Sequence, residues 1–157
     1  MKPATVVLSL ILILMLAFGA FFYTGGTLQA QATSITAGAA EHPDAFESIK
    51  AVLASGSAPQ LFSTDVLDNA ANYSLVDLSI SLTNRGIFDA EWLNVQLQGV
   101  TGDIAVYSLT GDGTDVAARS NSQVNLKLIT RAPADSPRSV SIQYYVYGIS
   151  RTIEIPV

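Results

Sequence analysis

Between residues 73 and 83 the sequence reads Y-S-L-V-D-L-S-I-S-L-T. Val76, Leu78, Ile80 and Leu82 alternate there with polar side chains. Because successive side chains of a β-strand point to opposite faces of a sheet, this alternation predicts a strand with one buried face and one wet face. Half-buried strands are typical of antiparallel sheets, so the stretch favours an antiparallel all-β domain.

Further segments with the features of short strands lie on both sides of this stretch. They span residues 60–63, 91–98, 104–109, 123–130, 138–147 and 151–157. Turn-forming Gly, Asn, Asp and Pro residues occur between them. The pattern predicts an all-β fold, an immunoglobulin-like antiparallel β-sandwich of about seven strands.

The last two predicted strands are joined by Gly148 and Ile149. A glycine at the first central position is what a two-residue type II′ turn requires. This turn would pair Ile142 with Ile155 and direct residues 140, 142 and 144 to one face. Turn chemistry and hydrophobic pattern therefore predict the same hairpin, with an apolar inner face.

Residues 75–86 read L-V-D-L-S-I-S-L-T-N-R-G, and residues 93–97 read L-N-V-Q-L. A strand that ends in Asn-x-Gly, followed by a strand of alternating apolar residues, resembles adhesion-type sandwich modules. CARDB-like, LEA14-like and fibronectin-III-like domains look similar here. The resemblance covers residues 73–157 and implies an immunoglobulin-like fold, but it carries over no functional residue.

The N-terminal segment is strongly apolar, and residues 4–23 contain no charged side chain. A helix of about 20 such residues matches the thickness of a bilayer. Lys2 favours a cytoplasmic N-terminus, which places the rest of the chain outside the cytoplasm. We therefore predict a single-pass membrane anchor within residues 1–26.

A cleaved signal peptide is the alternative to this anchor. Ala30-Gln31-Ala32 forms an A-x-A pattern, so signal peptidase could cut after Ala32 and release a secreted protein. The apolar stretch is longer than the usual core of a signal peptide and ends well before the cut. These two features favour the uncleaved anchor.

The next segment, residues 27–42, is rich in Ala, Thr, Gly and Gln without apolar periodicity. It is expected to form a flexible linker to a domain over residues 43–157. The domain would open with a short amphipathic helix at 43–56, in which Asp44 and Glu47 have the spacing of a capping box. Its apolar stripe, Phe46, Ile49 and Leu53, is expected to pack on the domain.

Composition argues against several classes of function. The chain has 8 Lys and Arg against 13 Asp and Glu and a formal net charge of -5, which disfavours nucleic-acid binding because phosphate contacts need clustered positive charge. It contains no cysteine, which excludes disulfides, thiolate metal sites and cysteine nucleophiles. No sequence motif indicates a cofactor.

The sequence offers no catalytic constellation. Its one histidine, His42, lies in the predicted linker, where it cannot be held rigidly against a nucleophile. Acidic residues such as Asp103 are expected in turns and at outward strand positions, not as a facing pair. The loop T-G-D-G-T-D at 110–115 offers Asp112 and Asp115 as possible calcium ligands, although Asp-Gly is also a common turn sequence.

Three large aromatic residues, Trp92, Tyr145 and Tyr147, are candidates for partner contact. Each lies next to an inward residue of its strand, so we expect them to point away from the core unless another part of the domain covers them. The expected function is a non-enzymatic structural or protein-interaction module of the cell envelope, with the lipid bilayer and another envelope protein as partners. The alternative is a secreted module that binds calcium or carbohydrate.

Overall fold

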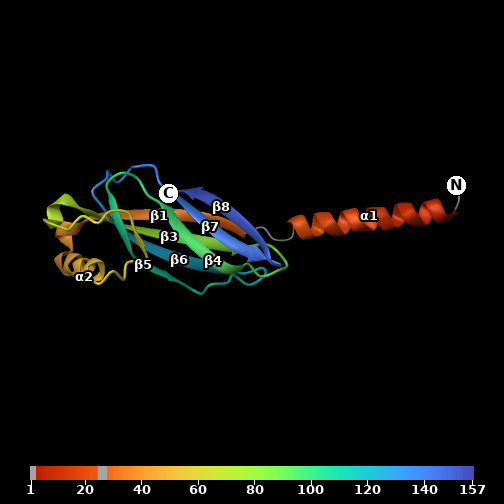
Figure 1. Ribbon diagram of the computed structural model, residues 1–157, viewed down its shortest axis with the longest axis horizontal. Coiled ribbons are helices and arrows are strands. Elements are labelled where there is room, and N and C mark those ends of the chain that lie inside the picture. The colour runs from red at the N-terminus through yellow and green to blue at the C-terminus, as the bar shows by residue number, and fades with distance from the viewer. Residues whose placement is uncertain (1–2, 25–27) are drawn as a thin grey trace.

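The structure is a computed structural model that describes residues 3–24 and 28–157. A helix, α1, extends from one end of a two-sheet domain, and the short helix α2 lies at the other end (Figure 1). The elements are α1 (Pro3–Thr24), β1 (Leu28–Gly38), η1 (Ala39–Glu41), α2 (Pro43–Ala54), β2 (Gln60–Leu61), η2 (Ala70–Asn72), β3 (Ser74–Asn84), β4 (Glu91–Gln98), β5 (Asp103–Gly111), β6 (Asn121–Thr130), β7 (Ser139–Val146) and β8 (Ile149–Pro156).

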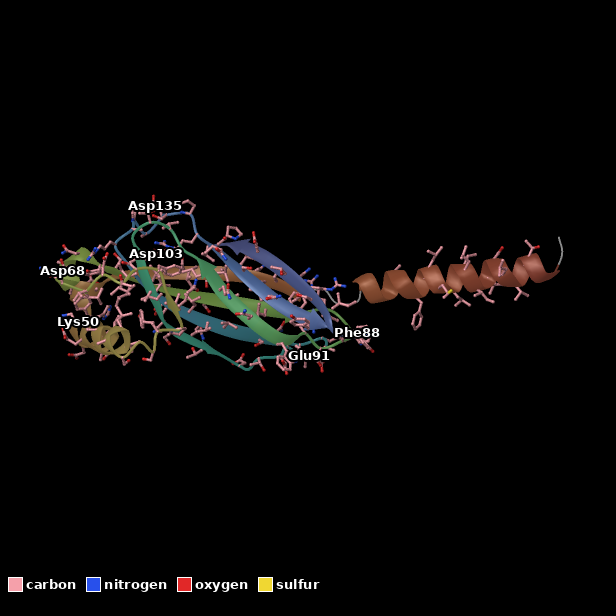
Figure 2. The ribbon with its side chains drawn as sticks, viewed as in Figure 1. Lys50, Asp68, Phe88, Glu91, Asp103 and Asp135 are labelled. Atoms are coloured by element: carbon pink, nitrogen blue, oxygen red, sulfur yellow. The ribbon has the colours of Figure 1, made fainter. Side chains whose placement is uncertain are left out.

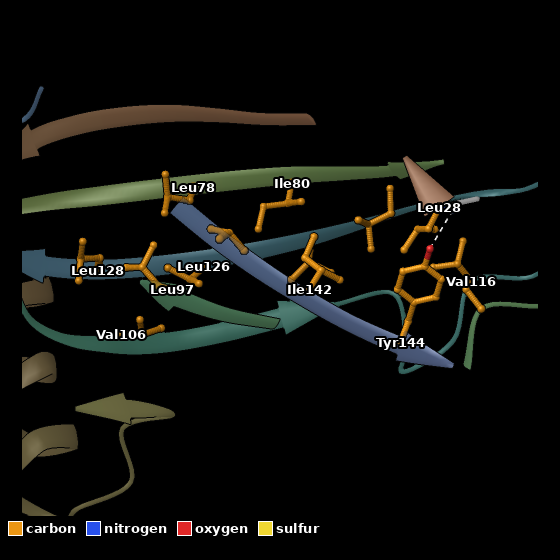
Figure 3. Packing of buried hydrophobic residues seen from close by; sticks show 14 of the residues in the cluster. Leu28, Leu78, Ile80, Leu97, Val106, Val116, Leu126, Leu128, Ile142 and Tyr144 are labelled. Carbon is orange, nitrogen blue, oxygen red and sulfur yellow. Dashed lines mark hydrogen bonds between the residues drawn. The ribbon is translucent and has the colours of Figure 1, made fainter. Parts of the chain in front are cut away.

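The strands form two antiparallel sheets with a common core. The larger sheet has the order β1-β3-β6-β5-β2 and the smaller β4-β7-β8. The side chains that alternation placed inward meet between the sheets (Figure 3). Six of them are 0% exposed: Ile80, Leu82, Leu97, Leu128, Val140 and Ile142. The predicted antiparallel β-architecture is therefore confirmed, and every predicted strand is present within a few residues of its expected bounds.

Strand β1 was not predicted. Residues 28–38, expected within the flexible linker 27–42, pair along their whole length with β3. Leu28, Ala30 and Ala32 contact the core at every second position. The alternation is present, but small alanine side chains make it hard to recognise. The linker prediction is wrong over β1 and η1, and the described part of the domain begins at Leu28 and not at residue 43.

The β7–β8 hairpin has the predicted faces but a different turn. Its loop residues are Tyr147 and Gly148 instead of Gly148 and Ile149. Both have positive φ, 54° and 72°, as a type I′ turn requires. Ile142 consequently lies opposite Ile153, two residues from its predicted partner. A shift of two leaves the buried faces unchanged, because side chains alternate with a period of two.

Helix α2 covers a second, smaller core. Phe46 and Ile49 are buried, and Leu53 packs beside them, as the apolar stripe predicted. They share this cluster with Ile104 and Ile129, which come from β5 and β6. The amphipathic helix therefore closes one end of the domain, and its packing role is confirmed.

The start of α2 differs from the prediction. Pro43 occupies its first turn and His42 is the N-cap, and no side chain of the described residues caps the helix. Proline suits the first helical position because its missing N–H would have no partner there. The predicted capping box between Asp44 and Glu47 does not form, and Glu47 instead lies 2.9 Å from Lys50.

Helix α1 projects from the end of the domain at which β1 begins (Figure 1). Every residue from Thr5 to Ala20 is exposed, although most are large and apolar. Residues 1–2 and 25–26 of the predicted anchor lie outside the described residues. Across the part of the chain that is described, no helix is long and apolar enough to cross a membrane.

Candidate contact surface

The three candidate contact residues differ in exposure. Trp92 is 76% exposed and Tyr147 is 62% exposed. Tyr145 is only half-buried, between the buried residues Tyr144 and Val146. Because Trp92 precedes the core-contacting strand positions of β4 and Tyr147 forms the β7–β8 turn, both rings lie at the same end of the sandwich.

Trp92 adopts an unusual backbone conformation. Its φ is 56°, in the left-handed region that residues other than glycine seldom occupy. The register between β4 and β7 shifts between Glu91 and Asn94, so Trp92 lies in a β-bulge. The Asp115 carboxylate accepts a hydrogen bond of 2.9 Å from the Trp92 backbone N–H. Bulges and left-handed residues are often found at functional sites, which supports a contact role for Trp92.

Tyr147 is held by a neighbouring loop. Its ring meets that of Phe88 edge to face, with centroids 4.2 Å apart. The buried Asn84 side chain fixes this loop, because its amide donates to the Phe88 carbonyl at 2.8 Å and its oxygen accepts from the Gly86 N–H at 2.9 Å. The Asn-x-Gly motif of residues 84–86 therefore forms a side-chain-supported turn that positions an aromatic contact.

These residues define a surface that we call the aromatic end: Ile87, Phe88, Trp92, Tyr147 and Ile149. All but Phe88 are among the exposed large apolar side chains. Figure 2 shows Phe88 and Glu91 at the end of the sandwich that faces α1. The sequence did not single out Ile87, Phe88 or Ile149, because loop residues carry no periodic signal. The aromatic end therefore unites two predicted contact residues with three that were missed.

Replacing Tyr145 and Tyr147 together by alanine should lower the free energy of unfolding by only about 1 kcal/mol, since neither ring is fully buried. Tyr144→Ala is the matched control, because this neighbouring ring is 3% exposed. The control should cost about 3–5 kcal/mol. Chemical denaturation of the full chain in detergent measures both losses. Equal losses would show that Tyr145 and Tyr147 belong to the core.

The possible calcium ligands have structural partners instead. The Asp112 carboxylate accepts from the Gln123 N–H at 2.9 Å, and Asp115 accepts from Trp92 as described above. Among residues 3–24 and 28–157, no three acidic, histidine or cysteine side chains gather as a metal site would require. His42, at the start of α2, is exposed. These residues thus act as turn and cap positions of the fold.

Asp103 was expected on the surface, but the structure buries it. The side chain of Asp103 is completely buried, where it meets Arg138 at 2.7 Å. Thr130 donates to the same carboxylate at 2.7 Å, and the Val100 N–H donates at 2.8 Å. Burial alone would raise the pKa of Asp103, but the hydrogen bonds from Arg138, Thr130 and Val100 outweigh it and hold the pKa below its usual value. The network ties the start of β5 to Thr130 of β6 and to the segment that precedes β7.

An apolar hollow lies at the end of the domain opposite the aromatic end. It measures about 400 Å³ and is bounded by α2 and residues 61–67. Leu61 and Val66, which are both exposed, form part of its wall together with Lys50. The hollow is mainly apolar and brings no catalytic set of side chains together.

No protein-family model and no curated protein matches this chain. The function of the chain must therefore be inferred from its own residues. The features that call for an explanation are the exposed apolar helix α1 and the aromatic end of the sandwich beside it.

Proposed function

We propose that this protein is a membrane-anchored, immunoglobulin-like sandwich that acts outside the cytoplasm as a non-enzymatic structural or protein-interaction module of the cell envelope. Helix α1 would attach it to the bilayer, and the aromatic end would be its contact surface. The observation that carries the proposal is the exposed apolar surface of α1.

Exposing this apolar surface to water is unfavourable in free energy. Residues such as Leu8, Met15 and Leu16 are 71%, 70% and 66% exposed, and the exposed large apolar side chains of α1 run from Val6 to Phe18. Burying each fully would contribute about 1.5–3 kcal/mol. A helix that is apolar on all sides needs a cover on all sides, which lipid provides. The charge-free sequence of residues 4–23 supports the same assignment.

The secreted alternative is less compatible with the fold. A cut after Ala32 would separate residues 28–32 from the rest of β1, although Ala30 and Ala32 pair with Leu82 and Ile80 of the core strand β3. It would also remove Leu28, which is 4% exposed. An intact β1 therefore favours the uncleaved anchor over release.

The distribution of polar side chains supports a non-enzymatic role. The buried network around Asp103 is fully engaged in internal hydrogen bonds, so its carboxylate has no freedom to act on a substrate. The exposed aromatic and aliphatic residues of the aromatic end are instead the side chains that contact surfaces favour. We therefore assign contact, not catalysis, to this domain.

The anchor is tested by fractionating cells that express the full chain. The protein should remain with membranes after alkaline extraction, and its intact mass should include residues 1–32. Changing Leu12 and Leu14 together to arginine should release it, because each arginine at the centre of a membrane helix costs about 2.5–3.5 kcal/mol. The same two positions changed to alanine are the control and should stay bound. A mature chain that begins at Thr33 would contradict the proposal.

A further inference from the structure

The connection between α1 and the sandwich is very short. The helix ends at Thr24 and β1 begins at Leu28. Each residue spans at most about 3.6 Å, so Leu28 lies within about 14 Å of the helix end. If α1 is embedded in a bilayer, the end of the sandwich that contains Leu28 is confined to the region next to the lipid headgroups.

The aromatic end is this same end of the sandwich. Leu28 pairs with Asn84, the residue that fixes the Phe88 loop. The Leu28 N–H also donates to the Tyr144 hydroxyl at 3.4 Å, which places β1 beside the last residues of β7 (Figure 3). The exposed rings of Trp92 and Tyr147 are therefore held close to where α1 enters the domain.

The exposed residues have the composition of a membrane interface. Tryptophan and tyrosine are enriched where lipid headgroups meet the hydrocarbon, because their rings are amphipathic. The aliphatic residues Ile87 and Ile149, at the same end, are 38% and 56% exposed. Such apolar residues at one end of a soluble domain indicate a surface that is covered in the working protein.

A second feature of this end suits a lipid headgroup. Arg85 and Arg119 line a shallow hollow of about 310 Å³ together with Asn84 and Ser120. The two arginine segments are joined, since the Arg119 N–H donates to the Gly86 carbonyl at 3.2 Å. Neither guanidinium is in an ion pair with a carboxylate of the described residues. Guanidinium groups bind phosphate oxygens well, and phosphates lie in the headgroup layer.

We propose that the aromatic end lies on the membrane itself, with Trp92, Tyr147 and Ile149 among the lipid headgroups and Arg85 and Arg119 beside lipid phosphates. This inference rests on the proposed membrane anchor. It deepens that proposal, because the bilayer then contacts the sandwich as well as α1. The domain is held in one orientation, and its opposite end, with α2 and the apolar hollow, points away from the membrane.

Trp92 is the chain's one tryptophan, so its fluorescence reports on the aromatic end alone. The full chain is reconstituted into phosphatidylcholine nanodiscs. We expect a blue-shifted emission, loss of quenching by the neutral water-soluble quencher acrylamide, and strong quenching by lipids brominated near the headgroup. Arg85→Gln with Arg119→Gln should partly restore acrylamide quenching, while free inorganic phosphate should have no effect on the parent.

The matched control moves the reporter to the other end of the domain. In the variant Trp92→Phe with Val66→Trp the new ring replaces a side chain that is 89% exposed beside α2. This ring should be quenched by acrylamide and not by brominated lipid. Equal shielding at both positions would overturn the inference, because the effect would then not be specific to the aromatic end.

The outcomes separate this inference from the anchor. If the chain enters nanodiscs but acrylamide still quenches Trp92, the membrane contact is overturned while the anchor stands. The aromatic end would then be assigned to contact with a protein partner. A chain that fails to enter nanodiscs overturns both proposals. Shielding of Trp92 in discs that contain only lipid supports the bilayer as the contact.

Discussion

Ile142→Asp should unfold the domain at room temperature. Ile142 lies at the centre of β7 and is 0% exposed, between the two sheets (Figure 3). The change removes a buried apolar side chain and places a carboxylate among the apolar side chains of the core, so its cost should exceed about 4 kcal/mol. Domains of this size have a total stability of about 5–15 kcal/mol. Circular dichroism during heating of the full chain in detergent should show no cooperative β-sheet transition.

The controls for this variant vary one factor at a time. Ile142→Val keeps the site apolar and should cost about 0.5–1.5 kcal/mol. Thr152→Asp introduces the same charge on β8 at an exposed position and should change stability by about 0.5 kcal/mol or less. If the Ile142→Asp variant melts at the same temperature as the parent, the side chain of Ile142 does not face the core. The facing of β7 would then be assigned wrongly.

Asp103→Leu should destabilise the domain by about 3–5 kcal/mol, because it leaves the buried Arg138 guanidinium without its carboxylate. Thr130 and the Val100 N–H would lose the same acceptor. Adding Arg138→Met should recover much of this loss, since replacing both members of a buried ion pair by apolar residues avoids an unpaired charge. Chemical denaturation at neutral pH measures the single and double variants. A double variant as unstable as the sum of its two single variants would contradict a direct coupling.

The same pair predicts how stability depends on pH. Hydrogen bonds hold the pKa of Asp103 in the folded protein below its usual value of 3.8. A carboxyl group with a lowered folded-state pKa stabilises the fold above the unfolded pKa, and this contribution is lost as the pH falls through the folded-state pKa. The parent should therefore lose more stability below about pH 4 than the Asp103→Leu, Arg138→Met variant. Parallel curves for the two proteins would contradict the ionised pair.

The contact surface could be predicted only in part. Alternation correctly placed Tyr144 inward and therefore directed attention to Tyr145 and Tyr147. It could not find Ile87 and Phe88, because they lie in a loop whose conformation depends on the Asn84 side chain, which donates within the loop to Phe88 and to the distant Val116. Alternation also could not show that Trp92 lies in a bulge, because the same sequence is compatible with a regular strand.

The buried ion pair was also beyond sequence reasoning. Asp103 and Arg138 are 35 residues apart in the chain, and each alone is typical of a solvent-exposed strand end. Only the approach of β5 to the segment before β7 gives each charge its partner and allows both to be buried. The decisive energy is a pairwise one between residues that no local pattern connects.

The sequence by itself determined which side chains of β3, β4, β6 and β7 face the core, because a period of two and the removal of apolar side chains from water are local rules. It also determined an apolar N-terminal segment and a short amphipathic helix. The register of the last hairpin was left open by two residues, since such a shift keeps every apolar side chain on the same face. The tertiary structure decided that register through the turn at Tyr147 and Gly148.

Tertiary structure alone also decided that residues 28–38 are a strand. Ala, Gln, Thr and Ser have little apolar surface of their own, so this segment is ordered by its pairing with β3 and not by its own hydrophobic pattern. Because of this pairing, residues 28–38 are a strand of the sandwich instead of a flexible linker, and the sandwich begins close to α1. The position of the aromatic end beside the helix follows from it, because strand pairing couples residues far apart in the chain while sequence patterns report only on near neighbours.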